Sequence, residues 1–180
     1  MRMTAYNLII TVIIFFTGCK KNINSEIYYL PHGFTGRVFI FYNQKSGEAE
    51  KLDSGAIVFY IPKNGVLKTK FNRDKNDSLT FFWLDSTGKK ERIPIRGING
   101  VDSNVVQIFN AKWETHSLIT ESNEMINGQK HTTTKTSDSG VYYLRFIVAK
   151  YSDRNKYNFE SGFDEQSFIE NIAKENNINW

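Results

Sequence analysis

Apolar residues recur along most of the chain in short runs or at every second position, and both patterns predict β-strands. Residues 66–71 alternate apolar and polar side chains, which is the period of a strand with one buried face. Residues 35–42 carry apolar side chains on both faces, Val38 and Ile40 on one and Phe39 on the other, which indicates a central strand. Further strands are predicted at residues 26–30, 56–61, 79–84, 105–109 and 141–149.

An Asn-Gly pair at positions 64 and 65 predicts a tight turn, because both residues accept the positive φ that two-residue hairpin loops require. Pro62 stops the preceding run, since it has no backbone N–H for a strand ladder. We therefore expect residues 56–61 and 66–71 to form a hairpin.

A second Asn-Gly pair, at positions 127 and 128, predicts another hairpin, with residues 117–126 and 129–136 as its two strands. A connection of this length without structure would be unusual in a compact domain. Both strands are polar and bury little. Two interpretations stay open: an arm that projects from the body and binds a partner, or a solvated edge hairpin whose polarity prevents aggregation.

The C-terminal segment changes to helical spacing. The apolar residues Phe168, Ile169 and Ile172 recur at intervals typical of one helix face, and Asp164 stands near the start, where a helix dipole favours acids. Asn176 ends the pattern. The whole predicts a mainly β protein, an antiparallel β-sandwich with one C-terminal α-helix.

The N-terminus has the layout of an export signal. Arg2 supplies a positive charge, and residues 8–16 are an apolar run far shorter than the ~20 residues of a membrane-spanning helix. The following Phe16-Thr17-Gly18-Cys19 resembles the lipobox of bacterial lipoproteins. That resemblance implies cleavage before Cys19, a thioether from its sulfur to diacylglycerol, and further acylation, for example with palmitate. An ordinary signal peptide or an uncleaved anchor, with a chance cysteine, is the alternative.

Cys19 is the only cysteine of the chain, so an internal disulfide is impossible and a structural role for this residue is hard to find. We expect residues 1–18 to be a lipoprotein signal peptide, 19–25 a lipidated tether and 26–180 a single β-rich domain. Lys20 follows the cysteine in place of the aspartate that commonly retains lipoproteins at an inner membrane. The expected location is the cell envelope, lipid-anchored, at an outer membrane if the cell has one.

Charge is modest and dispersed. The formal net charge of +4 falls to +3 once Arg2 is removed with the leader. Lysines and arginines are mixed with acids and form no long basic stripe, which a nucleic-acid interface would need. We therefore expect no nucleic-acid partner. The membrane, through lipid on Cys19, is the expected partner, and a protein or glycan partner in the envelope stays open.

No residue pattern predicts catalysis. The histidines, His32, His116 and His131, lack the spacing of a helical zinc site, and no Gly-x-Ser-x-Gly elbow occurs. Asp74 and Asp85 have the spacing of the ends of a calcium loop, but Leu79 replaces the glycine of its sharp turn. We predict no catalytic, cofactor-binding or metal residue, and Cys19 as the lipidation site.

Two other features bear on recognition. Residues 61–66 and 93–98 both read Ile-Pro-x-x-Gly-aliphatic, which predicts shared turn chemistry more than an internal duplication, because the flanking residues differ. Aromatic residues make up 14% of the chain, too many for one core face. Most should fill the space between two sheets, and some should be exposed, where they can stack on sugars or anchor an interface.

A resemblance covers residues 26–71. The segments Leu30-Pro31-His32-Gly33-Phe34-Thr35-Gly36-Arg37-Val38, Tyr42-Asn43-Gln44, Tyr60-Ile61-Pro62 and Gly65-Val66-Leu67-Lys68-Thr69 are similar to a family of uncharacterised bacterial exported domains. The resemblance implies a sandwich of transthyretin-like or carboxypeptidase-regulatory-like shape. Because the family has no known activity, the resemblance transfers no site residue to this chain.

These features together predict a membrane-anchored envelope lipoprotein of unknown biochemical activity, most simply a non-enzymatic binding or structural module. Two alternatives are kept. One is an envelope enzyme whose site is assembled only in three dimensions, with a histidine beside carboxylates in a pocket. The other is a lipoprotein of inhibitor or immunity type that neutralises a partner.

Overall fold

The computed structural model describes residues 25–72, 78–96, 103–127, 129–157 and 164–178. The predicted leader, the lipidation site Cys19, and most of the tether lie outside these residues, as do Asp74 and the Gly-Ile end of the second Ile-Pro segment. Among the described helices, none is both long and apolar enough to cross a membrane.

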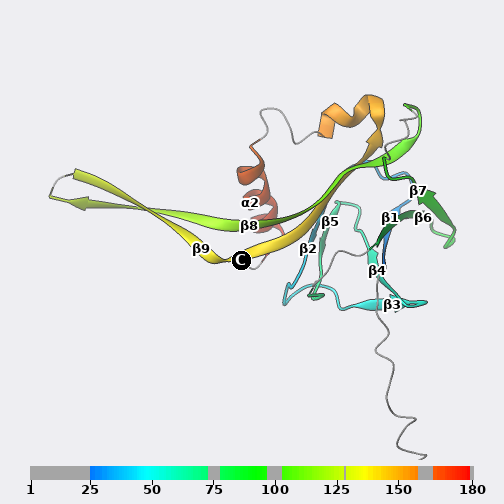
Figure 1. Ribbon diagram of the computed structural model, residues 1–180, viewed down its shortest axis with the longest axis horizontal. Coiled ribbons are helices and arrows are strands. Elements are labelled where there is room, and N and C mark those ends of the chain that lie inside the picture. The colour runs from blue at the N-terminus through cyan, green and yellow to red at the C-terminus, as the bar shows by residue number, and fades with distance from the viewer. Residues whose placement is uncertain (1–24, 73–77, 97–102, 128, 158–163, 179–180) are drawn as a thin grey trace, which may run out of the picture.

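Two β-sheets face one another and form the body of the molecule (Figure 1). Sheet A has the strand order β3 (Lys51–Asp53), β4 (Ala56–Tyr60), β1 (Ser25–Pro31), β6 (Ser78–Leu84) and β7 (Lys90–Ile93). Sheet B has the order β5 (Val66–Lys68), β2 (Gly36–Phe41), β9 (Gln129–Lys150) and β8 (Val106–Ile126). The predicted mainly β sandwich is confirmed, although its sheets are mixed.

The structure differs from the predicted antiparallel sandwich because some of its strand pairs are parallel. Strand β1 runs parallel to both β4 and β6, and β2 runs parallel to β5. The β2–β9, β8–β9, β3–β4 and β6–β7 pairs are antiparallel. The parallel pairs join strands between which the chain passes through the other sheet, as from β1 to β4 and from β2 to β5, whereas consecutive strands of one sheet pair antiparallel.

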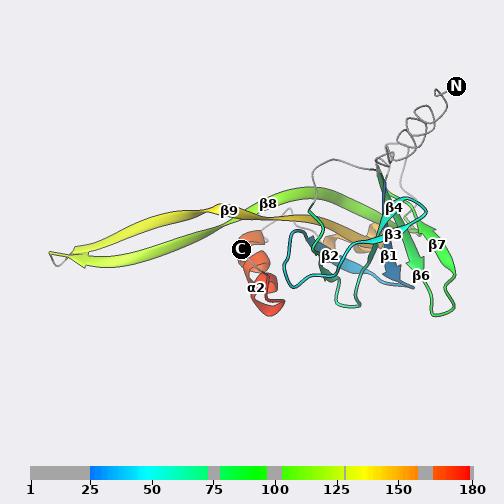
Figure 2. The same cartoon turned by 90° about the horizontal axis from the view of Figure 1, so that it is seen from below.

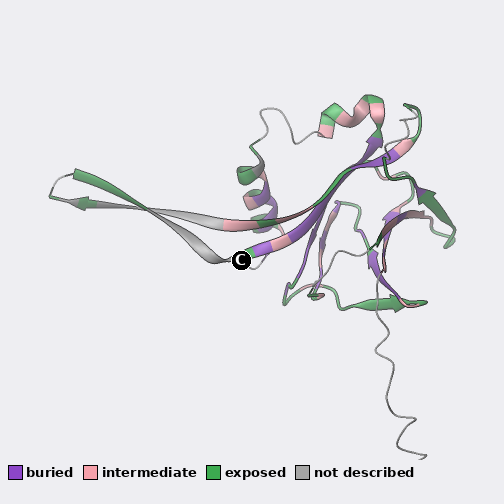
Figure 3. Cartoon of the chain, viewed as in Figure 1, coloured by how far each residue is buried: buried purple, intermediate pink, exposed green. Residues whose placement is uncertain are grey.

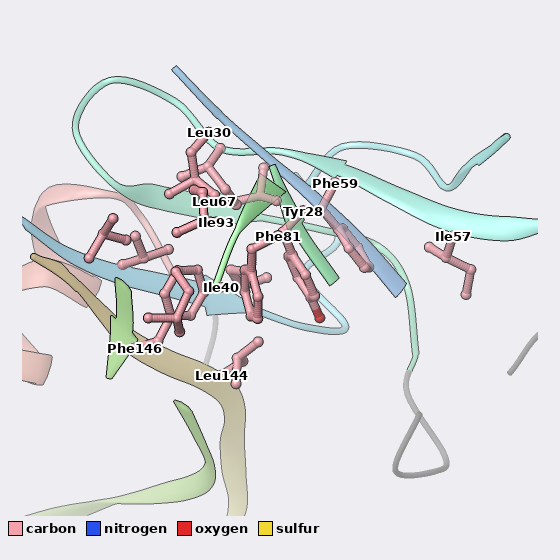
Figure 4. Close-up of a cluster of buried hydrophobic side chains, with 14 of the residues drawn as sticks. Tyr28, Leu30, Ile40, Ile57, Phe59, Leu67, Phe81, Ile93, Leu144 and Phe146 are labelled. Carbon is pink, nitrogen blue, oxygen red and sulfur yellow. The ribbon is translucent and has the colours of Figure 1, made fainter. Parts of the chain in front are cut away.

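The main core fills the space between the sheets (Figure 4). Period-2 alternation turns Tyr28 and Leu30 of β1 inward, where Tyr28 stacks between the rings of Phe59 and Phe81 at centroid distances of 5.1 and 5.0 Å. Sheet B contributes Leu144, Phe146 and Val148 of β9 and Val38 and Ile40 of β2. The buried positions therefore run along both sheets of the body (Figure 3).

A second apolar layer lies on the opposite face of sheet B, under helix α2 (Glu165–Glu175). Phe39 and Phe41 of β2 point into it, so β2 is buried on both faces and is the predicted central strand. Helix α2 adds Ile169, Ile172 and Ala173. The predicted C-terminal helix is confirmed.

The ends of α2 match the predicted signals. At the N-cap, Asp164 accepts hydrogen bonds from the backbone N–H and the hydroxyl of Ser167, at 3.1 and 2.6 Å. These bonds lower the pKa of the Asp164 carboxyl below its usual value. At the C-terminal end, the Asn176 side chain donates to the Ile172 carbonyl at 2.8 Å. A 3₁₀ segment, η2 (Tyr151–Tyr157), follows β9 and was not predicted.

The predicted hairpin between residues 56–61 and 66–71 is wrong. Strand β4 belongs to sheet A and β5 to sheet B. The Ile61 N–H still donates to Tyr29 of sheet A at 2.8 Å, whereas the Gly65 carbonyl already accepts from Phe39 of sheet B at 2.9 Å. The turn at Asn64-Gly65 therefore carries the chain from one sheet to the other instead of folding it back.

The second Ile-Pro segment makes the same crossing. Strand β7 ends at Ile93 in sheet A, and after Pro94 the chain forms a parallel bridge between Ile95 and Ile108 of β8. The Arg96 N–H donates to the Ile108 carbonyl at 3.0 Å, and the Ile108 N–H donates to the Pro94 carbonyl at 2.9 Å. In both segments, Ile-Pro thus marks a sheet change, which is the shared turn chemistry expected of the repeat.

Candidate functional site

The hairpin around Asn127 is much longer than predicted and leaves the body of the molecule. Strands β8 and β9 have 21 and 22 residues, so the predicted strands at 105–109 and 141–149 are the two ends of this same hairpin. We call residues 117–140, paired from Ser117↔Gly140 to Ile126↔Gln129, the arm. Figures 1 and 2 both show its outer half extending beyond every other described element.

The arm is a polar two-stranded ribbon with two open edges. In the body, β9 lies between β2 and β8, but the pairing with β2 ends at Tyr143, so within the described residues neither strand of the arm has a third neighbour. Near the tip, Met125 is 71% exposed. The other exposed side chains there are those of Asn127, Gln129, Lys130, His131, Thr132 and Thr133. The arm therefore offers backbone donors and acceptors along both edges.

The two strands of the arm carry opposite charge. Within the arm, β8 contains Glu121 and Glu124, a net charge of −2, whereas β9 contains Lys130, Lys135 and Asp138, a net charge of +1. The register sets Glu124 opposite His131 and Met125 opposite Lys130. One edge strand is thus acidic and the other basic, so a two-fold pairing of like edges from two copies would place like charges opposite one another.

The root of the arm is fixed by a network around Glu114 on the face of sheet B that α2 covers. Its carboxylate accepts hydrogen bonds from Arg145 at 2.9 Å and from the Tyr143 hydroxyl at 3.0 Å, and it lies 2.6 Å from the Lys112 ammonium. Burial raises the pKa of Glu114, but hydrogen bonds from Arg145, Lys112 and Tyr143 outweigh it and lower the pKa to about 2. The carboxylate is therefore ionised at neutral pH.

His116 extends this network towards the helix. It lies opposite Val141 on the same face of the hairpin, and its Nε2 atom is 3.8 Å from the Glu170 carboxylate of α2. His116 thus brings the root of the arm next to the C-terminal helix.

Aromatic rings hold the other face of the root. Trp113 and Tyr142 lie parallel, with centroids 5.7 Å apart, and both contact the ring of Tyr42, at 5.4 and 5.9 Å. The Tyr42 hydroxyl is 3.2 Å from that of Tyr28, which in turn donates to Glu26. A buried polar chain therefore runs from the root into the core.

This polar chain was not predicted from the sequence. Glu26 is fully buried at the start of β1. Burial raises the pKa of the Tyr28 hydroxyl well above its usual value, and the charges of Tyr42 and Glu26 add to the effect. The signal that could have found it is the alternation of β1, which turns Glu26 inward together with Tyr28 and Leu30.

The histidines lie in three separate places. His32 follows β1 and has its ring 6.1 Å from that of Trp83, His116 lies at the root, and His131 is exposed on the arm. Over the described part of the chain, no three His, Cys, Asp or Glu side chains gather closely enough to hold a metal. Asp85 uses its carboxylate to accept from Thr87 and Lys89 in a turn. Among the described residues the three histidines therefore do not come together, and His116 lies beside a carboxylate, that of Glu170.

A pocket of about 450 Å³ lies at the edge of sheet A between β6 and β7. Its apolar walls are Leu79, Phe81, Ile93, Pro94 and Ile95, and Thr80 and Arg92 are its polar residues. No carboxylate, histidine or cysteine lines it, so it contains no acid–base pair.

Comparison with known proteins identifies a family whose function is unknown. No curated protein matches the chain. A solved structure described as "Crystal Structure of Putative Lipoprotein from Bacillus anthracis" is similar at 13% identity and a TM-score of 0.47, covering 85% of this chain and 93% of that one. The family match spans residues 22–150 and so includes the 26–71 segment of the predicted resemblance and the whole arm. The chain belongs to DUF6843, a family of unknown function.

Proposed function

We propose that the protein is a lipid-anchored binding module of the bacterial cell envelope, and that the arm is its partner-binding element. The anchor rests on the sequence Phe16-Thr17-Gly18-Cys19 after a short apolar run. The family match starts at residue 22, just beyond this cysteine, so the leader lies outside the matched domain. Two or more acyl chains hold a protein stably on a membrane, since each buried CH₂ contributes about 0.8 kcal/mol.

The projection of the arm is the observation that carries the binding function. An isolated two-stranded hairpin is at best marginally stable in water, because it lacks a hydrophobic face packed on another layer. Here, Figure 3 shows exposed residues at the outer end of the ribbon, while β9 is mostly buried in the body. A polar extension of this length adds little to the core, so its contribution is to reach a partner.

The chemistry of the arm fits an extended protein segment. Among the described elements no third strand pairs with either edge of the arm, and a partner strand can bind the N–H and C=O groups of an edge by adding to the ribbon. Threonines at 132, 133 and 134 favour the extended conformation on the β9 side. The acidic β8 edge and the basic β9 edge then select partner strands of opposite charge.

The projection of the arm also supports the alternative of an inhibitor or immunity role. A narrow polar ribbon that reaches beyond the body can enter a partner's cleft as well as pair with its strand. The identity of the partner separates the two: an enzyme or toxin captured by the arm and inactivated by the purified protein favours inhibition.

The anchor is tested by labelling cells with a fatty-acid analogue. The wild-type protein should take up label and migrate with membranes, whereas Cys19→Ser should take up none. Wild-type protein without label contradicts the anchor.

The arm is tested by shortening it. Deleting residues 120–135 and joining 119 to 136 through Asn-Gly keeps a two-residue hairpin turn and leaves the Glu114 network intact. Cross-linking in intact cells should capture an envelope protein with the wild type and lose it with the shortened chain. The matched control, Met125→Ser, keeps both backbone edges and should retain capture. Equal capture by the shortened chain assigns binding to another surface.

A further inference from the structure

The outer face of sheet A carries an aromatic row in which Tyr60 is 41% exposed and Phe82 is half-buried, whereas Tyr29 between them is only 3% exposed because the neighbouring side chains cover it. Strand register places Tyr60 of β4, Tyr29 of β1 and Phe82 of β6 side by side, and Arg92 of β7 lies opposite Phe82. The Tyr29 ring is 5.3 Å from that of Tyr60 and 5.9 Å from that of Phe82. Sheet B differs, because α2 covers its outer apolar face.

Basic side chains border this row. The Lys90 ammonium lies 4.6 Å from the Tyr29 ring centroid, and the Lys51 ammonium lies 4.9 Å from that of Tyr60. Lys51 also pairs with Glu48 at 3.1 Å, and Lys90 with Asp53 at 3.7 Å. All four side chains are about half exposed, so these ion pairs are weak and the lysines can exchange a carboxylate for another anion.

The predicted tether fixes which surface this row can reach. Strand β1 begins at Ser25, six residues after Cys19, and six extended residues span about 20 Å. Tyr29 lies four residues further along β1, about 13 Å from Ser25. The aromatic row is therefore within reach of the lipid surface that holds Cys19.

Resting on the proposed lipid anchor, we propose that the outer face of sheet A lies on the membrane, with the exposed Tyr60 and the half-buried Phe82 in the headgroup layer and Tyr29 supporting them from within the sheet. Tyrosine is favoured at the membrane–water interface, and lysine can extend its ammonium to lipid phosphates while its stem covers apolar surface. The preferred surface is anionic, because Lys51, Lys90 and Arg92 face it. The tip of the arm and sheet A lie at opposite ends of the molecule in both views (Figures 1 and 2), so this contact directs the arm away from the membrane.

The test measures the depth of two positions in the full acylated protein, reconstituted in phosphatidylglycerol or phosphatidylcholine vesicles. A nitrobenzoxadiazole fluorophore is attached at Tyr60→Cys, whose tyrosine is 41% exposed, or at Met125→Cys on the arm. In phosphatidylglycerol, the probe at position 60 should shift to the blue and be quenched by lipid-borne quenchers. The probe at position 125 should report water in both lipids.

A charge variant and its matched control complete the test. Lys90→Gln with Arg92→Gln removes two charges from the face, and each charge near an anionic surface contributes about fivefold to partition. It should lower quenching at position 60, whereas Lys150→Gln with Lys174→Gln, on exposed positions of sheet B and α2, should not.

Three results overturn the proposal. Acylated protein whose probe at position 60 stays in water contradicts the orientation alone, and a probe that responds to an added acidic polysaccharide but not to lipid assigns the face to a glycan. Protein whose mass shows no acyl chains contradicts the anchor and, with it, the orientation.

Discussion

The body and the arm are built from the same two strands, but different interactions hold them. In the body, the β9 residues Val141, Tyr143 and Leu144 are buried, with sheet A on one face and α2 on the other. In the arm, the same strand pairs only with β8, and its outer end is exposed. Strands β8 and β9 pair with one another in both regions, apart from two register shifts, so side-chain burial is what separates a stable sheet from a thin ribbon.

The boundary between the buried part of β9 and the arm lies at Gly140, which is exposed and precedes the buried Val141. A Cβ atom placed there would lie 2.5 Å from Thr115 Cγ2 and 3.3 Å from the His116 carbonyl oxygen, so a larger residue requires the exposed Thr115 side chain to rotate away. The register also shifts between Ser117 and Ile119. Bulges of this kind bend a strand pair and increase its twist. The arm can therefore leave the plane of the body sheet at a local irregularity, beyond which the ladder resumes at Ile119↔Thr136.

The largest effect should come from the body. Phe146→Ala removes a fully buried ring that meets Phe81 at 4.8 Å, and large-to-small core substitutions of this kind cost about 3–5 kcal/mol. Met125→Ala on the arm should change the free energy of unfolding by less than about 0.5 kcal/mol. Denaturant unfolding followed by circular dichroism checks both. Equal losses would mean that the arm contributes to the cooperative core.

The crossing between the sheets should be the next most sensitive position. Gly65 has φ +77°, and a Cβ atom there would lie 2.4 Å from the Arg37 carbonyl oxygen. Gly88 has φ +85° with open space around it. Gly88→Ala should cost about 1 kcal/mol from backbone strain alone, and Gly65→Ala about 2–4 kcal/mol, because it adds a clash. Thermal and denaturant unfolding of both variants measures the difference. Similar losses of stability in the two variants would show that the sheets can move apart at the Gly65 crossing at little cost in free energy.

The contribution of the Glu114 network to the free energy of unfolding should depend on pH. Because the folded-state pKa of Glu114 is about 2, below its usual value near 4.5, its contribution is present above pH 4.5 and is lost as pH falls towards 2. Solvent screening reduces it, so Glu114→Gln should cost about 1–2 kcal/mol at pH 7. The exposed Glu91→Gln is the control. A gap between wild type and Glu114→Gln that stays constant from pH 5 to pH 2 would contradict the ionic role of this carboxylate.

Alternating polarity was enough to predict most strands and the sandwich, but not which strands pair. Asn64-Gly65 and Asn127-Gly128 carry the same local turn signal. The second forms a hairpin, whereas the first changes sheets, because apolar runs on both of its sides can each be buried in a different sheet. Whether an Asn-Gly pair forms a hairpin or a sheet crossing depends on the packing of the whole domain. A local sequence pattern carries no information about that packing.

The arm was predictable and its root was not. A polar threonine-rich segment around Asn-Gly is sufficient to indicate a solvated hairpin, and counting back from the turn correctly pairs Ile119 with Thr136. The same register continued from Ile119 towards the body would pair Glu114 with Val141. The bulge shifts the register by two residues and sets Glu114 opposite Tyr143 instead, beside Arg145. Short strands such as β3 and β7 were missed because they contain few apolar residues.

The smallest effect on stability, and the sharpest test of the arm, comes from single prolines at its edge. In an antiparallel pair, successive residues direct their N–H groups alternately to the partner strand and to the open edge. Of Thr133→Pro and Thr134→Pro, one therefore breaks a bond to β8, and the other removes only a donor at the open edge. Hydrogen exchange on neighbouring amides tells which substitution preserves the hairpin. That variant should unfold within about 0.5 kcal/mol of wild type yet capture less partner, since strand addition needs the edge donor. Undiminished capture would mean that the β9 edge is not the one that pairs, and the same pair of substitutions at Ser122 and Asn123 then tests the β8 edge.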